Sequence, residues 1–417
     1  MLFNRDVLPN RLRIVTETVP HVQSVSVGIW IGTGSRDEDD SNSGISHFIE
    51  HMLFKGTEKR TAQQIADEFD SIGGHLNAFT EKEYTCYYAK VLCEHLPIAV
   101  DVLGDMLLNS IFDPEEMERE KNVVLEEIKR YEDSPDDLIH DVFARTIWNG
   151  HPLGNSVLGN RETVAGLTRD SIIAHLRKYA TPENIVVAAA GNLDHSNFVE
   201  LIGKQFGSLN GTSAPTNQVP PDFRAKSNMT SRPTEQVHFC VGTRGYSQLD
   251  ENKYTLALID TALGGGMSSR LFQEIREKRG LVYAIGSYSI GYRESGLFAA
   301  YGGTSIENLE LVIDLVRGQF ENVRKSGLTE KEITRAKNQI RGALVLGQEN
   351  MTARMIRLGK SELYVRRVVP VDEIIEKVKN VTQDDINRVA EEIFDESTIS
   401  VAAIGPFDDQ KVVMTNE

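Results

Sequence analysis

Polar and apolar residues alternate in short stretches, and longer amphipathic stretches follow them. VSVGIWIGTG, residues 25–34, and TCYYAKVL, residues 85–92, alternate with a period of two, which is typical of strands with one buried face. Helical patterns follow both of them. This order of strands and helices favours an α+β sheet with helices packed on one face over a doubly wound nucleotide-binding fold. The sequence also contains no GxGxxG or P-loop motif.

The hydrophobic pattern of the first half of the chain occurs again in the second half. Three pairs of segments match co-linearly at offsets of 213–216 residues: 94–107 with 307–320, 118–128 with 334–344, and 167–193 with 381–407. The last pair reads twice as an amphipathic helix, a turn and a buried strand that ends in glycine. We infer two homologous halves of the α/β-sandwich type, each a mixed or antiparallel sheet with helices packed on one face.

Between the halves, residues 211–233 are rich in Pro, Ser, Thr and Asn and show little periodicity. This composition predicts a linker. We therefore expect an N-terminal domain over residues 1–210 and a homologous C-terminal domain over residues 234–417.

Composition and charge limit the class of protein. The chain has 417 residues, 40% of them hydrophobic, and a net charge of -16, which argues against nucleic acid or an anionic membrane surface as its main partner. Its three cysteines cannot form a paired framework, which fits a reducing compartment. The N-terminal stretch lacks signal-peptide features, and no apolar run is long enough to span a bilayer. We expect a cytoplasmic protein that does not bind nucleic acid or membranes.

The stretch GISHFIEHMLFKGT, residues 44–57, carries two histidines and a glutamate in an apolar context. If residues 45–55 form a helix, His47 and His51 lie on one face and Glu50 lies beside them. Two imidazoles suit a catalytic zinc, which takes three protein ligands and leaves one position for water. A carboxylate beside that water can accept its proton. The alternative is that two structural histidines are neighbours by chance.

A second helix is predicted to start at Asp113, which reads as an N-cap followed by Pro114 and a capping-box partner at Glu116. Glu120 and Glu127 are seven residues apart and share a face of this helix. One of them could bind the metal while the other orients a histidine. An acidic helix taken alone is more often a solvated face.

HFIEH, followed 76 residues after His51 by Glu127, resembles the inverted-zincin signature of the pitrilysin, insulin-degrading enzyme and mitochondrial processing peptidase family. The likeness is closest to the processing peptidases and their bacterial relatives, and it covers essentially the whole chain. It implies that His47, His51 and Glu127 bind one Zn²⁺ per chain. It also implies that Glu50 is the general base and that Glu120 is the acidic residue that supports a ligand.

Residues 73–85, GGHLNAFTEKEYT, resemble the edge strand with which this family binds a substrate peptide as an added strand. The resemblance implies that Asn77 helps to hold the scissile carbonyl and that Ala78 and Phe79 lie alongside the peptide. Without the family, this is only a strand entered through glycine.

The stretch IREKRGLVYAI resembles the part of the family's C-terminal domain that grips the substrate. Arg276 and Tyr283 would hold the substrate backbone and stabilise the oxyanion of the tetrahedral intermediate. The alternative is a basic helix end followed by a strand tyrosine. Gly264, Gly265 and Gly266 resemble a short version of the glycine-rich loop that the mitochondrial enzyme carries on a partner subunit.

Apart from a carboxylate at the position of Glu50, the second half has lost the side chains of the proposed metal site. Offsets of 210 and 216 place Ala257, Asp260, Thr261, Ala336 and Ala343 opposite His47, Glu50, His51, Glu120 and Glu127. The surrounding apolar pattern persists, so the metal-site residues form a set with a shared role. The second half is interpreted as a lid that grips the substrate.

The resemblance implies a zinc endopeptidase that hydrolyses short or unfolded peptides in an enclosed chamber. Because family members build that chamber from four such domains, a chain with two implies a homodimer. The absence of a targeting extension points to a bacterial protein. The alternative is a non-catalytic structural or peptide-binding subunit, like the core proteins of the respiratory cytochrome complex.

Overall fold

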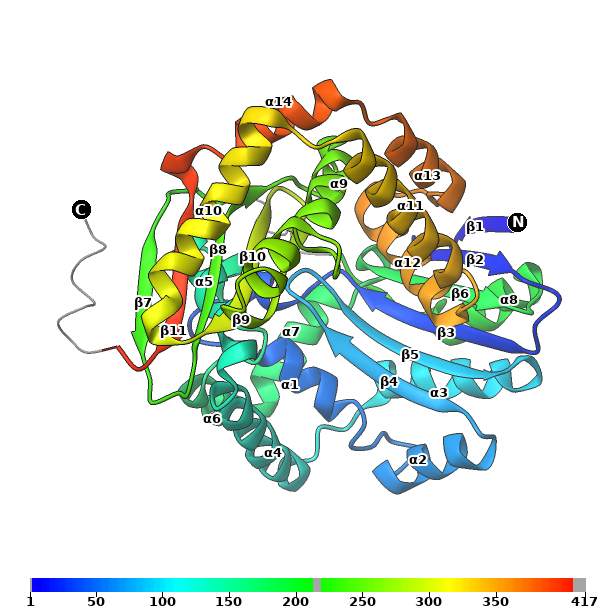
Figure 1. Ribbon diagram of the computed structural model, residues 1–417. Coiled ribbons are helices and arrows are strands. Elements are labelled where there is room, and N and C mark those ends of the chain that lie inside the picture. The colour runs from blue at the N-terminus through cyan, green and yellow to red at the C-terminus, as the bar shows by residue number, and fades with distance from the viewer. Residues whose placement is uncertain (1, 213–218, 408–417) are drawn as a thin grey trace. The chain divides into compact units, whose positions relative to one another are not determined.

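The computed structural model describes residues 2–212 and 219–407, which form two compact units. Each unit is assembled from three separate stretches of the chain. The first unit contains residues 1–129, 155–217 and 346–369, and the second contains residues 130–154, 218–345 and 370–417. Each unit is built around one β-sheet (Figure 1).

The first unit has a six-stranded mixed sheet. Its strands lie in the order β1 (Leu2–Val7), β2 (Arg13–Thr18), β6 (Ile185–Gly191), β3 (Ser24–Ile31), β5 (Thr85–Leu92) and β4 (His75–Thr80). β2 and β6 are parallel, and the other neighbouring pairs are antiparallel. Among the described strands β4 pairs only with β5, so residues 73–85 contain an edge strand, as predicted.

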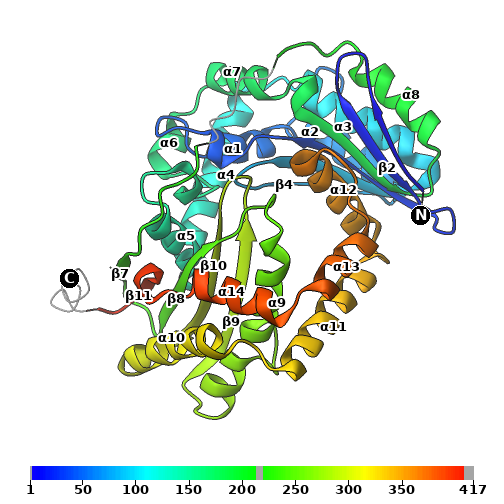
Figure 2. The ribbon, with the colours of Figure 1, turned by 90° about the horizontal axis from the view of Figure 1, so that it is seen from above.

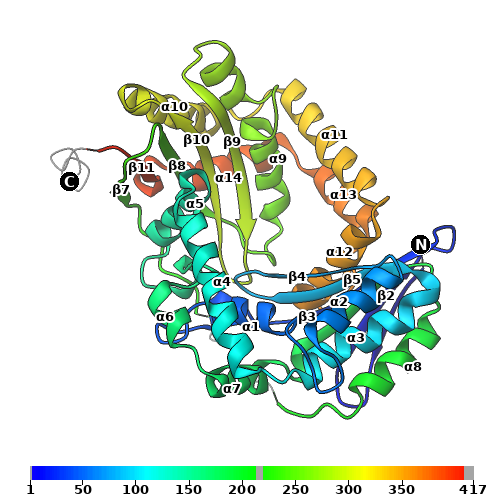
Figure 3. The same cartoon turned by 90° about the horizontal axis from the view of Figure 1, so that it is seen from below.

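Helices of the first unit cover one face of this sheet. They are α1 (Ile45–Met52), α2 (Ala62–Ser71), α3 (Leu96–Asn109), α4 (Pro114–Glu132), α6 (Arg161–Gly166), α7 (Arg169–Tyr179) and α8 (His195–Phe206). Alternate residues of β3, Val25, Val27 and Ile29, pack into the same buried core as Phe48 of α1 and Leu103 of α3. Figure 3 shows α3 and α8 against this face of the sheet.

The opposite face of the first sheet is covered by α12 (Met351–Val365), which comes from the second half of the sequence (Figure 2). Met355 and Leu358 pack there against Trp30, and all three side chains are fully buried. Gly359 permits this close approach, because a Cβ atom at that position would lie 2.2 Å from the Trp30 ring.

The second unit has a five-stranded mixed sheet. Its strands lie in the order β7 (Ser227–Ser231), β11 (Ser400–Gly405), β8 (Val237–Gly245), β10 (Gly296–Thr304) and β9 (Val282–Gly291). β7 and β11 are parallel, and the other neighbours are antiparallel. β9 is an edge strand among the described strands, as β4 is in the first sheet.

The described residues of the second unit form six helices of ten or more residues. They are α5 (Pro135–Ile147), α9 (Asn252–Gly264), α10 (Leu309–Ser326), α11 (Glu330–Gly347), α13 (Val371–Asn380) and α14 (Gln383–Ile393). Helices α9, α10 and α14 contribute to the core on one face of the sheet. On the other face, Ile139 and Phe143 of α5 pack against Cys240 and Ala402. Helix α5 comes from the first half of the sequence, so the two halves exchange one helix each.

The predicted α+β architecture of two similar halves is confirmed, with one addition: each sheet also carries one exchanged helix on its opposite face. The repeat extends to local detail. Thr168 and Thr382, 214 residues apart, each cap a helix by accepting a hydrogen bond from the backbone N–H three residues later. The turn and strand after each helix also match, in β6 and β11.

The stretch 211–233, predicted as a linker, contains β7, so the second sheet begins before the expected domain start at residue 234. Its sequence SNMTS is polar because β7 pairs on one side only, with β11. Residues 213–218 of the expected linker lie outside the described residues. Across residues 2–212 and 219–407, no helix has both the length and the apolar composition of a membrane span.

Candidate metal centre

Helix α1 begins at a glycine in the left-handed region, Gly44, whose φ is +92°. No side chain at this position caps the helix. The buried carboxylate of Glu38 does so from the preceding loop, because it accepts hydrogen bonds from the N–H groups of Gly44 (2.7 Å) and Ser46 (2.9 Å). Burial raises the pKa of Glu38 to about 7. The helix ends at Met52, earlier than the expected 45–55, because Leu53 and Phe54 continue as a turn packed into the core.

His47 and His51 lie one turn apart on α1, and their ring centroids are 4.6 Å apart. Glu127 reaches the same point from α4. Its Oε2 lies 3.8 Å from His47 Nε2 and 3.5 Å from His51 Nε2, and the three groups place one ligand atom each within 4.8 Å of the others. Ligands about 2.0–2.1 Å from a tetrahedral zinc are about 3.3–3.4 Å apart, so this set fits zinc with little movement.

The two histidines differ in protonation. Burial, followed by the neighbouring His51, lowers the pKa of His47 to about 4, so its imidazole is neutral and can bind a metal. Burial also lowers the pKa of His51, but hydrogen bonds to Glu120 and Glu127 outweigh burial and raise it to about 9. A metal that binds here therefore displaces a proton from His51.

Glu120 contacts the Nδ1 side of the His51 ring. Its Oε1 lies 2.8 Å from His51 Nδ1, which directs Nε2 toward Glu127. Its Oε2 pairs with Lys55 Nζ at 2.6 Å. Burial raises the pKa of Glu120, but the hydrogen bonds from His51 and Lys55 outweigh it and give a net lowering. Lys55 is not among the residues predicted for this site, although its position four residues after His51 could have suggested it.

Glu50 is held by the edge strand. Thr80 Oγ1 donates a 2.5 Å hydrogen bond to Glu50 Oε2. Burial raises the pKa of Glu50 despite this bond. Thr80 is not among the residues predicted for this site. The alternation of side chains along the strand could have suggested it, because it places Thr80 on the same face of β4 as Ala78, toward α1.

The predicted substrate residues of β4 lie on two faces of the strand. Ala78 packs against the core beneath α1. Phe79 points to the other face, where its ring contacts Trp30 at 5.7 Å between centroids. Asn77 is exposed, and its Oδ1 accepts a hydrogen bond from the Ala78 N–H at 2.8 Å. The structure therefore brings neither the Asn77 nor the Phe79 side chain to the histidines.

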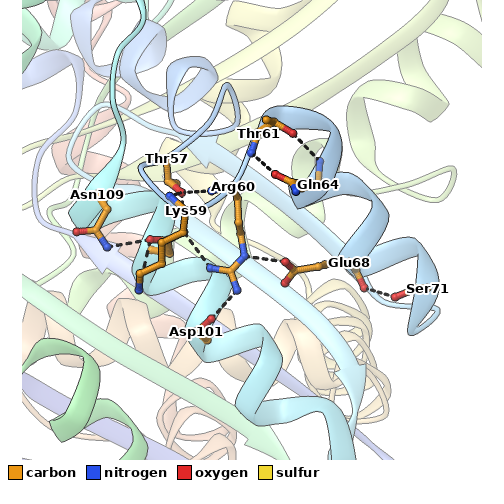
Figure 4. A network of polar contacts seen from close by, with 10 residues as sticks. Thr57, Lys59, Arg60, Thr61, Gln64, Glu68, Ser71, Asp101 and Asn109 are labelled. Atoms are coloured by element: carbon orange, nitrogen blue, oxygen red, sulfur yellow. Dashed lines mark hydrogen bonds and ion pairs between the residues drawn. The ribbon is translucent and has the colours of Figure 1, made fainter.

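A polar network fixes the loop that follows α1. Arg60 donates to Glu68 of α2 (2.8 Å) and to Asp101 (2.5 Å) and Asp105 (2.9 Å) of α3 (Figure 4). Thr57 donates to the same Asp105 at 2.6 Å. Because Asp105 is fully buried, these contacts fix the positions of the loop, α2 and α3 relative to one another.

The other predicted residues lie in the second unit. Arg276 stands in a short helical segment, Phe272–Glu277, with its guanidinium 5.4 Å from the centroid of the Tyr283 ring. Tyr283 is 80% exposed on the edge strand β9. Gly264 is the last residue of α9 rather than part of a loop, and a Cβ atom there would lie 2.2 Å from the Ser287 nitrogen. Gly265 and Gly266 follow it.

Comparison with known proteins identifies relatives over nearly the whole chain. Residues 13–161 match insulinase, peptidase family M16, and residues 166–340 match the peptidase M16 inactive domain. The uncharacterized zinc protease YmxG of Bacillus subtilis is 42% identical over 97% of this chain and 98% of its own. An uncharacterized zinc protease of Streptomyces coelicolor is 43% identical over 98% of this chain and 90% of its own. The crystal structure of a peptidase M16 inactive domain from Pseudomonas fluorescens has a TM-score of 0.91 at 19% identity over 98% of both chains, which shows a shared fold.

Proposed function

Because the chain belongs to the insulinase family of peptidases, family M16, and is a zinc metalloprotease, we propose that His47, His51 and Glu127 hold its zinc ion. The convergence of their three ligand atoms within 4.8 Å carries this proposal. Two imidazoles and one carboxylate leave a fourth position open, as in catalytic zinc sites. When bound, zinc supplies Lewis-acid polarisation of the scissile carbonyl and lowers the pKa of a water molecule.

Glu50 acts as the general base in this proposal. Its carboxylate accepts the proton of the attacking water and then passes it to the leaving amine. The raised pKa of Glu50, which burial causes, brings the carboxyl group closer to the working range of such a base. No covalent bond to the enzyme forms.

The substrate is a short or unfolded peptide, which adds to β4 as a further strand. Asn77 contacts the peptide beside the scissile bond. The backbone of Ala78 and Phe79, in the edge strand β4, lies alongside the peptide. Tyr283 stabilises the oxyanion and Arg276 holds the substrate backbone. Gly264, Gly265 and Gly266 contribute to substrate binding from the second half. The exposure of Tyr283 supports its assignment.

The active particle is a homodimer in the bacterial cytoplasm that encloses peptides in a processing-peptidase-like chamber. In this proposal the half that carries the metal comes mainly from residues 1–210 and the half that grips the substrate mainly from residues 234–417. Helices α5 and α12 are exchanged between them, and β7 of the connecting stretch 211–233 joins the second sheet. The resemblance to four-domain chambers supports the homodimer.

The test is cleavage of a quenched fluorescent peptide library by the parent, Glu50→Gln and the control Glu58→Gln, with zinc per chain measured for each. Glu58 is an exposed glutamate shortly after α1. We expect turnover in the parent and the control, and its loss in Glu50→Gln with zinc retained. Equal turnover in all three would contradict the role of Glu50. A zinc-loaded parent without turnover would favour a peptide-binding subunit.

A further inference from the structure

The contact between Glu50 and Thr80 joins the helix of the metal centre to the edge strand. Thr80 Oγ1 donates to Glu50 Oε2 at 2.5 Å. The neighbouring Thr85 hydroxyl lies 3.4 Å from Thr80 Oγ1 and donates its own proton to the carbonyl of Thr33 at 3.1 Å. Each hydroxyl has one proton, so the Thr80 proton is committed to Glu50.

The same contact occurs in the second half, which has no metal ligands. Asp260 of α9, opposite Glu50 in the repeat, accepts hydrogen bonds from Ser289 at 3.2 Å and from Ser287 at 2.5 Å. Strand pairing identifies Ser289 as the counterpart of Thr80. Thr80 pairs with Thr85 and Ser289 with Phe298, and the offset of 213 residues that relates helix α3 to helix α10 also relates Thr85 to Phe298.

The two carboxylates differ in how many of their oxygens are engaged. Ser287 bonds to Oδ1 of Asp260 and Ser289 to Oδ2, so both oxygens are occupied. The counterpart of Ser287 is Ala78, because Ala78 pairs with Tyr87 and Ser287 with Ala300 at the same offset. Ala78 offers no side-chain donor, and Oε1 of Glu50 accepts no hydrogen bond from any residue that the structure describes.

We propose that Thr80 is a positioning residue that fixes one oxygen of Glu50, and that alanine at position 78 keeps the other oxygen available to the proton of the attacking water. This inference rests on the proposed function of Glu50. In the second half, the residues at the same strand positions donate hydrogen bonds to both oxygens of Asp260, which gives this carboxylate a structural role. The first half satisfies only one oxygen of its carboxylate, which is what a general base requires.

The experiment compares Thr80→Val, which has nearly the same shape without the hydroxyl, with Thr80→Ser, which keeps it. The control is Ser289→Ala, which removes the equivalent hydroxyl from the second half. For each variant kcat, KM, zinc per chain and the thermal midpoint are measured. We expect Thr80→Val to lower kcat about 10- to 100-fold, as for a misplaced catalytic group, with KM changed less than about 2-fold. We expect Thr80→Val to hold as much zinc per chain as the parent. We also expect Thr80→Ser and Ser289→Ala to have the kcat of the parent.

A second variant tests the open oxygen directly. Ala78→Ser introduces the donor that the second half has in Ser287, and we expect it to lower kcat by engaging Glu50. Full kcat in both Thr80→Val and Ala78→Ser would overturn the inference, as would loss of zinc from Thr80→Val. Failure of the proposed function would give a different result, namely an inactive parent or an active Glu50→Gln variant, and can therefore be told apart from failure of this inference.

Discussion

At the scale of single residues, Glu120 fixes the orientation of the His51 ring. Its two oxygens face two different partners, His51 Nδ1 at 2.8 Å and Lys55 Nζ at 2.6 Å. The first contact fixes the ring orientation of His51, and the second neutralises a carboxylate that is only 4% exposed. These two contacts explain how the carboxylate of Glu120 can be buried beside the proposed metal site.

We predict that Glu120→Ala weakens zinc binding about 10- to 100-fold, because residues that orient a metal-binding histidine contribute effects of this size. Competition with a chromophoric zinc chelator measures the affinity. Glu118→Ala is the matched control, since Glu118 lies on the same helix, is 73% exposed and pairs only with Lys121 among the described residues. Equal affinity in Glu120→Ala and the parent would contradict the role of Glu120.

The proximity of the proposed metal-site residues could be predicted from the sequence because helical periodicity relates them. A spacing of four places His47 and His51 on one face, and a spacing of seven does the same for Glu120 and Glu127. Thr80 has no such relation to Glu50. It reaches the carboxylate only because β4 folds against α1, and a contact of this kind depends on tertiary packing.

At the scale of elements, α12 is held on the first sheet by buried ion pairs as well as by apolar contacts. Glu17, which is fully buried on β2, pairs with Arg354 and Arg357 of α12. The sequence did not predict that α5 and α12 are exchanged. An apolar helix face shows that a helix packs against a sheet, but it does not show which of two similar sheets it covers. The polar strand β7 was missed for a related reason, because a strand paired on one side needs little hydrophobic alternation.

We predict that Glu17→Gln lowers the free energy of unfolding of the first unit by about 3–5 kcal/mol, because two arginines then lose a buried partner. Urea denaturation in a Trp148→Phe background measures this, since Trp30 is then the only tryptophan and lies against α12. The control Glu200→Gln removes an exposed pair with Lys204 and should leave the midpoint unchanged. A normal midpoint in Glu17→Gln would contradict the account of α12.

The start of α11 gives a prediction that depends on pH. Glu332 accepts hydrogen bonds from Arg270 at 2.6 Å and from the Thr329 N–H at 2.8 Å. Burial raises the pKa of Glu332, but these bonds outweigh it and lower the pKa to about 2. The ionised carboxylate therefore stabilises the fold above about pH 4.5, and this contribution is lost as the pH falls toward 2. We predict that Glu332→Gln is less stable than the parent at pH 7 and that the difference in denaturation midpoint shrinks at pH 3. A difference that is the same at both pH values would contradict this.

At the scale of the whole molecule, the chain has two sheets of related design, and among the described residues only the first unit has a cluster of side chains that could hold a metal ion. The repeat places no histidine or glutamate opposite His47, His51 and Glu127, and in the proposed function the halves therefore have different tasks. In the proposed chamber, four such halves enclose the substrate. A single chain supplies two of them.

We therefore predict that the protein sediments with twice the mass of its 46.5 kDa chain under conditions in which it cleaves peptides. Sedimentation velocity over a range of concentrations measures the mass. A fully active monomer would contradict the proposed chamber, while leaving the metal centre unaffected. In the same assay, the enzyme should cleave unfolded peptides and spare folded proteins.

The most direct test of the metal centre is the zinc content of Glu127→Gln beside that of Glu126→Gln. The two glutamates are neighbours on α4, but Glu127 Oε2 lies 3.5 Å from His51 Nε2, whereas the side chain of Glu126 is 77% exposed and pairs with Lys129. After dialysis against a chelator and reloading, we predict one zinc per chain in the parent and in Glu126→Gln, and a loss of tight binding in Glu127→Gln. Equal zinc in both variants would show that the ion is held elsewhere.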